Sequence, residues 1–283
     1  MKRIILLTAF VNFSFLLLSA QNEIPYGNNP AVGKYTLVNG IKMYYETYGE
    51  GQPLLLIHGN GGSINSFAAQ IPGFTKKYKV IIADDRCHGK TECKTGDLTY
   101  EMMAADLNEL LNQLKIDSCL IWGHSDGAIL GLIIAFQYPD KVKKLVASGA
   151  NIQPDSTAIF PELIALEKMY PLIPDTLMRK QIKMMLFHPN IPFDKLKGIK
   201  APVLVMAGDR DAIREEHTVK IFQSIPNAQL CIVPGATHFF YDEKPQLFNY
   251  FITEFFEKPF LMPSTIKIQQ AMAERLLKEF KKN

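Results

Sequence analysis

A serine flanked by glycines occupies a position suited to nucleophilic chemistry. The segment Gly123-His124-Ser125-Asp126-Gly127 is a G-x-S-x-G pattern, which a random chain of this length would contain about one time in ten. Its context makes it more specific, because an apolar strand-like run precedes it and a helix-like segment follows it. A sharp turn there would lift the serine hydroxyl clear of the backbone. We therefore predict that Ser125 is a nucleophile for acyl transfer.

The chain also holds the partners that such a serine needs. Asp209 and Asp211 directly follow one apolar run, and His238 directly follows the next. In a parallel sheet all of these positions lie at the carboxyl edge, where ligands bind. We expect His238 to take the proton from Ser125, and one of the two aspartates to orient the histidine ring and offset its charge.

A glycine-rich loop supplies the remaining part of the predicted site. His58-Gly59-Asn60-Gly61-Gly62 follows an apolar run, at the place where an oxyanion-binding loop belongs. We expect the backbone N–H groups of Asn60 and Asp126 to face the developing oxyanion.

Strand-like and helix-like segments alternate along most of the chain, which predicts the α/β class with a mostly parallel sheet covered by helices on both faces. Asn39-Gly40 between two β-prone runs predicts a hairpin. Short apolar runs predict strands at Pro53–Ile57, Lys79–Ala83, Cys119–Trp122, Val142–Ser148, Val203–Ala207 and Gln229–Val233. Periodic segments predict helices at Thr99–Ile116 and Asp126–Tyr138.

The alternation stops in one segment with six prolines and two helical patterns, at 161–170 and 175–187, which predicts a small helical lid. The last segment is amphipathic, and we expect it to pack against the body, although its lysines would also suit a membrane surface. The predicted organisation is a signal peptide at 1–20, a core at 21–150, the lid at 151–197, the rest of the core at 198–257 and a C-terminal amphipathic helix at 258–283.

The N-terminus has the form of a secretory signal peptide. Lys2 and Arg3 precede an apolar run that is shorter than the ~20 residues needed to span a bilayer. We predict cleavage after Ala20 and an exported protein, periplasmic or secreted, without stable membrane insertion. An uncleaved anchor is the alternative.

Composition and cysteine usage exclude several other classes. A net charge of +3 over 283 residues leaves no basic excess for nucleic acid, and an aromatic content of 11% excludes disorder as the main state. Cys119 and Cys231 lie in apolar runs and are expected to be buried free thiols. Export permits disulfides, so Cys87 and Cys93, in one polar loop, are either bonded or free. We see no metal-ligand cluster and expect no metal and no cofactor.

The remaining histidines are expected to be non-catalytic. His58 and His124 flank the predicted turns and should hydrogen bond loop backbone. His88, His188 and His217 have no evident partner in the sequence, and we expect them at the surface.

These blocks resemble the α/β-hydrolase superfamily over residues 34–257. The segment 84–91 is similar to that family's Asp-x-Arg-Gly-His-Gly-x-Ser loop, with Cys87 in place of glycine and Thr91 in place of serine. Ser125-Asp126-Gly127 is most similar to the biphenyl-hydrolase-like (valacyclovir hydrolase-type) branch. The resemblance implies the α/β-hydrolase fold with a helical lid. It also selects Asp211 over Asp209, because the family places its acid as the second carboxylate of Gly-x-x-Asp.

Asp126 has a second candidate role. Many members of the family carry an apolar residue beside the nucleophile, and a carboxylate there is costly unless it is solvated or paired. One hypothesis is that Asp126 binds a cationic substrate group, such as the α-amino group of an aminoacyl ester. The alternative, which we favour, is a first-turn acid that the helix dipole stabilises by about 0.3–1 kcal/mol.

The function that this sequence predicts is hydrolysis of a small or medium carboxylic ester through an acyl-enzyme on Ser125, without a cofactor. Hydrolysis of a lactone or of a carbon–carbon bond could use the same triad. A ligand-binding pseudo-hydrolase and, more remotely, a membrane-tethered scaffold are the alternatives from other classes. The acyl group, the leaving group and the oligomeric state are not determined by the sequence.

Overall fold

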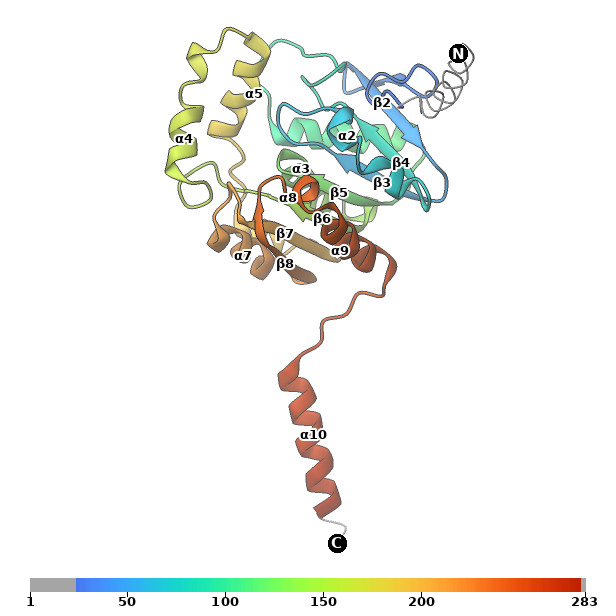
Figure 1. The fold of residues 1–283 in the computed structure, drawn as a ribbon, viewed down its shortest axis with the longest axis vertical. Coiled ribbons are helices and arrows are strands. Elements are labelled where there is room, and N and C mark those ends of the chain that lie inside the picture. Colours follow the sequence, from blue (N-terminus) through green and yellow to red (C-terminus); the bar gives the residue numbers. More distant parts are fainter. Residues whose placement is uncertain (1–23, 281–283) are drawn as a thin grey trace, which may run out of the picture.

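The computed structural model describes residues 24–280 (Figure 1). The predicted signal peptide and its cleavage point after Ala20 lie outside the described residues. The strands are β1 Lys34–Val38, β2 Ile41–Tyr48, β3 Gln52–Ile57, β4 Tyr78–Ala83, β5 Cys119–His124, β6 Val142–Ser148, β7 Val203–Arg210 and β8 Ala228–Thr237. The α-helices are α1 Ile71–Phe74, α2 Tyr100–Gln113, α3 Asp126–Gln137, α4 Pro161–Glu167, α5 Thr176–Phe187, α6 Phe193–Leu196, α7 Glu215–Ser224, α8 Phe240–Glu243, α9 Pro245–Glu257 and α10 Thr265–Phe280.

The strands form one sheet in the order β1-β2-β4-β3-β5-β6-β7-β8. Strands β1 and β2 pair antiparallel, as do β2 and β4, and the other neighbours are parallel. The predicted hairpin joins β1 to β2, because Asn39 and Gly40 both adopt the positive φ that such a turn requires. The mostly parallel sheet is therefore confirmed.

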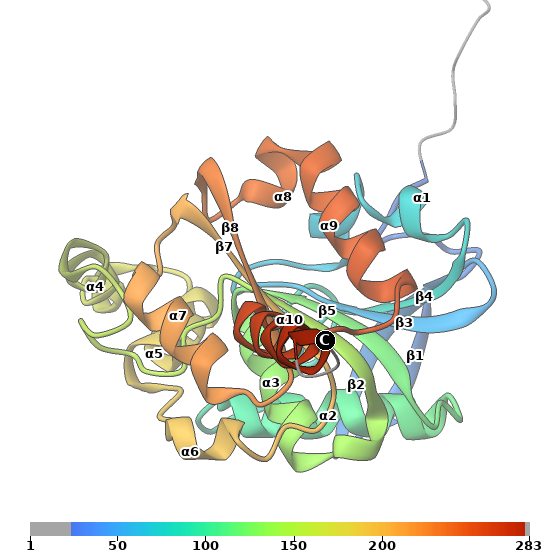
Figure 2. The same ribbon diagram turned by 90° about the horizontal axis from the view of Figure 1, so that it is seen from below.

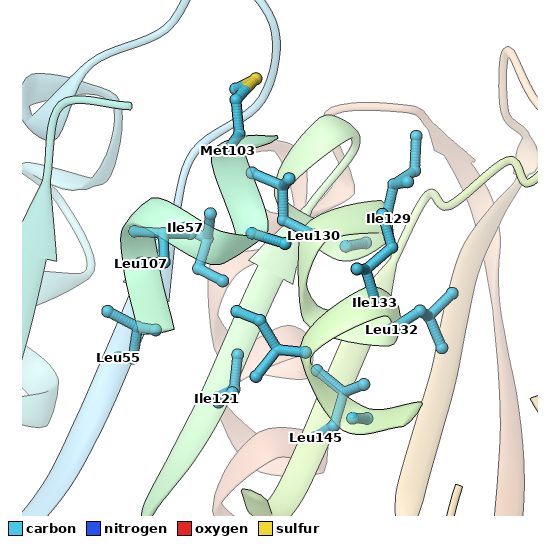
Figure 3. Packing of buried hydrophobic residues seen from close by; sticks show 14 of the residues in the cluster. Leu55, Ile57, Met103, Leu107, Ile121, Ile129, Leu130, Leu132, Ile133 and Leu145 are labelled. Carbon is cyan, nitrogen blue, oxygen red and sulfur yellow. The ribbon is translucent and has the colours of Figure 1, made fainter. Parts of the chain in front are cut away.

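Helices cover both faces of this sheet (Figure 2). On one face, Leu55 and Ile57 of β3 pack with residues of α2 and α3, such as Leu107 and Ile133 (Figure 3). The alternate strand residues point the other way, where Leu56 belongs to the same cluster as residues of α8 and α9. A buried aliphatic side chain contributes about 1.5–3 kcal/mol, so strands apolar on both faces are the main source of stability.

The segment between β6 and β7 carries the two expected lid helices, α4 and α5, with a short 3₁₀ turn at Tyr170–Leu172 between them. This segment leaves the sheet at the carboxyl end of β6, so the helices stand at the edge where Ser125 is placed. Ile159 forms an isolated antiparallel bridge with Ile213 of the core. The lid is thus attached to the body at its base.

The expected packing of the C-terminal helix against the body is wrong. Helix α10 begins at Thr265, after an extended stretch from Lys258 to Ser264, and none of its residues is buried. Figure 1 shows the helix projecting away from the sheet and its covering helices. Amphipathic spacing specifies that one face needs a partner, but it does not specify which partner.

Candidate active site

Ser125 sits at the junction between β5 and α3. Its backbone has φ 57° and ψ −120°, a conformation that a non-glycine residue rarely adopts and that stores strain. The elbow depends on close backbone approach at its two glycines. A Cβ on Gly123 would meet the carbonyl of Gly127, and a Cβ on Gly127 would meet the carbonyl of Ile57. The chain can therefore turn sharply here only because these positions lack side chains.

His238 and Asp211 are paired directly. The ring Nδ1 of His238 lies 2.6 Å from Asp211 Oδ1. The Asp211 side chain is fully buried and also accepts hydrogen bonds from the backbone N–H of Ile213 at 3.0 Å and of Gly208 at 3.3 Å. These contacts hold the carboxylate in one orientation and leave Nε2 of His238 as the free ring nitrogen.

Asp209 lies on the same loop but makes different contacts. Its carboxylate accepts a hydrogen bond from the backbone N–H of Ala236 at 3.2 Å and has no bond to His238. Backbone hydrogen bonds from Gly235 and Ala236 lower the pKa of Asp209. The structure thus places Asp211, and not Asp209, beside the histidine.

No hydrogen bond joins the serine to these groups. Within residues 24–280, the hydroxyl of Ser125 forms no hydrogen bond with His238 or with any other residue. Gly149 lies against the imidazole, since a Cβ there would approach Nδ1 of His238 to 3.0 Å. Serine–histidine hydrogen bonds are often long without substrate and tighten when it binds.

The predicted oxyanion loop lies beside the serine. A Cβ on Gly59 would be 3.0 Å from the Cβ of Ser125, so the loop passes directly over the elbow. The backbone N–H groups of Asn60 and Asp126 donate no hydrogen bond within the described residues. Asp126 is the first residue of α3, where backbone N–H groups have no partner inside the helix. Two unpaired donors therefore flank Ser125.

The side chain of Asp126 is buried and held by neutral donors. It accepts a hydrogen bond from the Asn60 amide at 2.9 Å and from the Tyr100 hydroxyl at 2.7 Å. Burial raises the pKa of Asp126, and these two hydrogen bonds oppose that rise. Burial, with a smaller contribution from the charge of Asp126, raises the pKa of Glu167 on the lid. Asp126 is therefore a buried carboxylate that has neutral donors and no ion-pair partner among residues 24–280.

Comparison with known proteins supports the same reading of the fold. The family model described as the alpha/beta hydrolase fold matches residues 52–170. The enol-lactonase from Burkholderia xenovorans LB400 superposes with a TM-score of 0.68 at 19% identity, over 80% of this chain and 100% of that one. The chain has the α/β-hydrolase fold.

Other proteins similar to this chain include the serine hydrolase BPHL of Mus musculus, 26% identical over 78% of this chain and 84% of that protein. The sn-1-specific diacylglycerol lipase ABHD11 of Xenopus tropicalis is 35% identical, but the match spans 43% of this chain and 39% of that protein. A thermophilic esterase from Thermogutta terrifontis superposes with a TM-score of 0.66 at 24% identity, over 81% of this chain and 99% of that one.

Two buried histidines lie beside the site. His58 donates from Nδ1 to the carbonyl of Gly59 at 2.8 Å and accepts at Nε2 from the backbone N–H of Asp85 at 3.0 Å. The expected bond to loop backbone is confirmed for His58 and is wrong for His124, whose Nδ1 lies 3.4 Å from the side-chain hydroxyl of Ser148. His124 packs against the ring of His238 at 4.8 Å, and burial holds the pKa of His124 well below its ordinary value. Both rings are therefore neutral parts of the scaffold.

The expected surface positions of His88 and His217 are wrong, because both side chains are buried. His88 bonds the carbonyl of Arg86 at 3.0 Å, and His217 accepts from the backbone N–H of Ile152 at 3.0 Å. Burial lowers the pKa of each to about 4. Their partners are backbone atoms, which no side-chain pattern in the sequence reveals.

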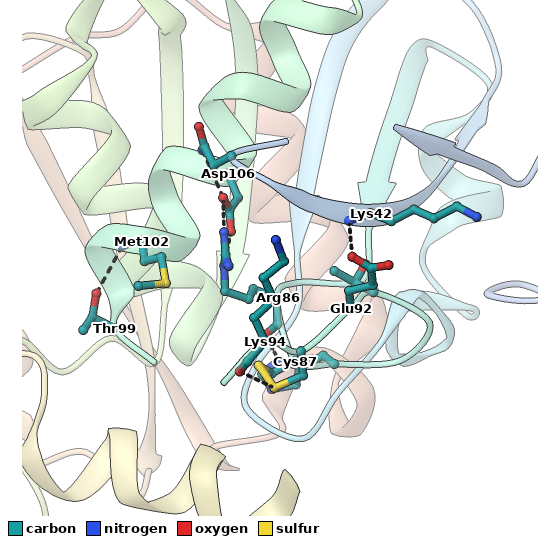
Figure 4. A network of polar contacts seen from close by, with 12 residues as sticks. Lys42, Arg86, Cys87, Glu92, Lys94, Thr99, Met102 and Asp106 are labelled. Atoms are coloured by element: carbon teal, nitrogen blue, oxygen red, sulfur yellow. Dashed lines mark hydrogen bonds and ion pairs between the residues drawn. A yellow bond between two sulfur atoms is a disulfide. The ribbon is translucent and has the colours of Figure 1, made fainter. Parts of the chain in front are cut away.

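The loop after β4 connects the core to the lid. Arg86 makes a bidentate ion pair with Asp106 of α2, at 2.6 and 2.8 Å, and this pair anchors the loop to that helix (Figure 4). Cys87 and Cys93 form a disulfide, and Cys87 adopts φ 64°, in the left-handed region. Of the two alternatives for these cysteines, the bonded form is the one present. Cys119 is a buried free thiol as expected, and Cys231 is only partly buried.

Three residues near the site were not predicted from the sequence: Tyr100, Glu167 and Gln181. Tyr100 is the first residue of α2, the helix that follows the disulfide loop. Its hydroxyl donates a hydrogen bond to Asp126. Gln181 and Glu167 belong to the lid helices. No short-range pattern marks these residues, because their contacts depend on how distant segments pack.

Neither a metal cluster nor a membrane-spanning helix is found between residues 24 and 280. No group of three or more His, Cys, Asp or Glu side chains there is arranged to hold a metal ion. None of the helices in that range is both long and apolar enough to cross a bilayer.

Proposed function

We propose that this α/β-hydrolase cleaves a small or medium carboxylic ester through an acyl-enzyme on Ser125. The observation that carries the proposal is the His238–Asp211 pair at 2.6 Å, placed at the same sheet edge as the strained elbow of Ser125. The elbow, the pair and the free N–H groups come from four separate segments, which follow β3, β5, β7 and β8, and together they supply a nucleophile, a base and an oxyanion site.

In the first step Ser125 attacks the ester carbonyl. Asp211 holds Nδ1–H of His238, so Nε2 is the nitrogen that accepts the serine proton. The carbonyl oxygen becomes an oxyanion between the N–H groups of Asn60 and Asp126. The tetrahedral intermediate then collapses, the alkoxide leaves with the proton carried by His238, and the acyl group remains on Ser125.

The second step repeats the same chemistry with water. His238, neutral again, takes a proton from a water molecule that attacks the acyl carbonyl. The oxyanion forms at the same position, and its collapse releases the acid and returns the proton to Ser125. The imidazolium of each step lies next to Asp211, which offsets its charge.

The test is turnover of the chain from Gln21 onward, and of its Ser125→Ala variant, on activated esters of increasing acyl length. We expect measurable hydrolysis that the substitution reduces by at least about 10³-fold. Equal rates for the two proteins would contradict the acyl-enzyme. If binding of a panel member also survived, a ligand-binding pseudo-hydrolase would be the better description.

Ester hydrolysis is one of several reactions open to this triad. Neighbours of the same fold include the enol-lactonase named above and a meta-cleavage product hydrolase, CumD. The ester panel should therefore be extended with a lactone and with a vinylogous 1,5-diketone, the chemical class for carbon–carbon hydrolysis. A kcat/KM higher on either compound than on every ester would replace the proposed substrate class.

Asp126 supports a narrower proposal, a substrate with a free amino group near the scissile carbonyl. The observation that favours it is the buried carboxylate of Asp126 next to Ser125, which is bonded only to the neutral donors of Asn60 and Tyr100. The variant Asp126→Asn keeps the size and removes the charge. It should lower kcat/KM on aminoacyl esters more than on their N-acetylated forms. Equal losses of kcat/KM on both kinds of ester would show that Asp126 does not bind the amino group and acts only as an acidic residue in the first turn of α3.

We also propose that the protein is exported. The Cys87–Cys93 disulfide supports this, because such bonds persist mainly in oxidising compartments. Intact-mass analysis of the protein purified from its native cell should give a chain that starts at Gln21. A mass that includes residues 1–20 would contradict cleavage after Ala20.

A further inference from the structure

Helix α10 presents an apolar face that nothing in the described part of the chain covers. The helix follows α9 through the extended stretch 258–264 and stands apart from the body (Figure 1). Phe280 is 78% exposed and Ile266 is 69% exposed. The large apolar side chains exposed along the helix are Ile266, Ile268, Met272, Leu276, Leu277 and Phe280.

These side chains gather on one broad side of the helix. With about 100° between successive residues, they cover an arc of about 180°, from Ile268 round to Leu277, with Leu276 near its centre. Gln269 and Glu279 also fall within this arc, and Lys267 and Lys278 lie on the opposite side. A broad, mainly apolar exposed surface of this kind marks an interaction site, because its contact with water is unfavourable.

Helix α9 shows what the same chain does when a partner is available. It is also amphipathic, and its apolar residues Phe248, Ile252, Phe255 and Phe256 are buried in the core. Helix α10 has a comparable pattern and buries none of its residues. Its apolar face is therefore built for a partner outside the body of this chain.

The width of the arc and the charges on the other side favour a lipid surface over a second copy of the helix. Paired helices use a narrow stripe of about two residues in seven, whereas helices that lie in a bilayer surface have a wide apolar face and a basic polar face. Lys267, Arg275 and Lys278 outnumber the acidic residues of α10, and the sequence continues with Lys281 and Lys282. Positive charge within about 10 Å of a bilayer is attracted to anionic lipids.

We propose that α10 binds to the surface of an anionic lipid bilayer, with the arc centred on Leu276 in the acyl boundary and Lys267 and Lys278 on the aqueous side. Leu261 and Met262, both exposed in the preceding stretch, extend this apolar surface. The extended stretch leaves the body in water beside the membrane. The proposal goes beyond the proposed hydrolase function and does not depend on it.

The test is flotation of the chain from Gln21 onward with vesicles of two compositions, phosphatidylcholine alone and equal parts phosphatidylcholine and phosphatidylglycerol. Starting at Gln21 removes the N-terminal apolar run, which could bind lipid by itself. The test variant is Leu276→Lys, at the centre of the arc. The matched control is Ala271→Lys, which adds the same charge on the polar side of the same helix. Hydrolysis of a soluble ester, or the circular dichroism spectrum, checks that each variant is folded.

We expect the unaltered chain and Ala271→Lys to float with the anionic vesicles and to bind phosphatidylcholine alone more weakly. Leu276→Lys should bind the anionic vesicles at least about tenfold more weakly, despite its extra positive charge. The proposal is overturned if the unaltered chain does not float, or if Leu276→Lys binds as well as Ala271→Lys. It is also overturned if light scattering shows a dimer that only Leu276→Lys dissociates, because α10 would then bind a second copy.

Discussion

The side-chain amide of Gln181 on the lid donates a hydrogen bond of 2.7 Å to the backbone carbonyl of Cys87. Both residues are buried. The backbone carbonyl of Gln181 accepts a longer bond, 3.5 Å, from the amide of Asn60 on the oxyanion loop. One residue of α5 therefore connects the lid to the disulfide loop and to the loop beside Ser125.

Replacing this residue should loosen the lid without removing any group that reacts. Gln181→Ala leaves the carbonyl of Cys87 buried and unpaired, which costs about 1–3 kcal/mol. We expect KM for the preferred ester to rise by about fivefold, with a smaller change in kcat, because the lid closes over bound substrate. Steady-state kinetics on the ester panel measures both constants.

Lys183→Ala is the matched control on the same helix. Lys183 pairs with Asp97 at 2.9 Å, and both side chains are exposed, so water and salt screen the pair and it contributes little to stability. We expect its KM to be unchanged. Equal increases in KM for the two variants would show that Gln181 has no special part in lid attachment.

The disulfide should stabilise the loop that carries these contacts. Cys93 is exposed and lies six residues after Cys87, so Cys93→Ser opens a short loop without disturbing the core. We expect the free energy of unfolding to fall by about 2 kcal/mol. Urea denaturation with and without reductant measures it. Reductant should lower the free energy of unfolding of the unaltered chain to that of Cys93→Ser and should leave the variant unchanged. If reductant destabilised both proteins, the loss of stability would not come from the disulfide.

The two aspartates of the loop after β7 should differ sharply in their effect on turnover. Asp211→Asn keeps the size but no longer holds the productive tautomer of His238, so kcat should fall by about 10⁴-fold. Asp209→Asn removes the charge but keeps an oxygen that can accept from the backbone N–H of Ala236, and kcat should change by less than about threefold. If the larger loss occurred in Asp209→Asn, the pairing of His238 would have to be reassigned.

Buried histidines should make the protein less stable in mild acid. Burial lowers the pKa of His217 to about 4, whereas the unfolded chain titrates near 6.5. Between these values the unfolded state binds a proton that the folded state does not, so the free energy of unfolding falls as the pH falls from 6.5 towards 4. The same sign holds for His58 and His88.

The variant His217→Gln isolates one of these contributions, because glutamine can still accept from the backbone N–H of Ile152. Between pH 7.5 and pH 5 it should lose about 1–2 kcal/mol less stability than the unaltered chain. Urea denaturation at the two pH values gives the comparison. An identical loss in both proteins would show that His217 is not part of the acid sensitivity.

Local patterns in the sequence determined the elements and their order. The apolar runs at 53–57 and 203–207 became β3 and β7, and Asn39-Gly40 became the hairpin turn. These features depend on the spacing of apolar side chains and on residues that readily adopt positive φ. Both are properties of neighbouring residues, so the sequence alone predicts them. The chain order Ser125, Asp211, His238 also placed the candidate groups at one sheet edge.

The tertiary structure gives the physical basis for choosing between groups that are equivalent along the chain. Asp209 and Asp211 are carboxylates on one loop, and their roles separate because one carboxylate reaches His238 while the other bonds Ala236. The burial of His88 and His217 depends on backbone partners, and so does the Gln181–Cys87 hydrogen bond. For α10, periodicity specified an apolar face, but whether another element covers that face depends on packing between distant segments, which a local pattern does not contain.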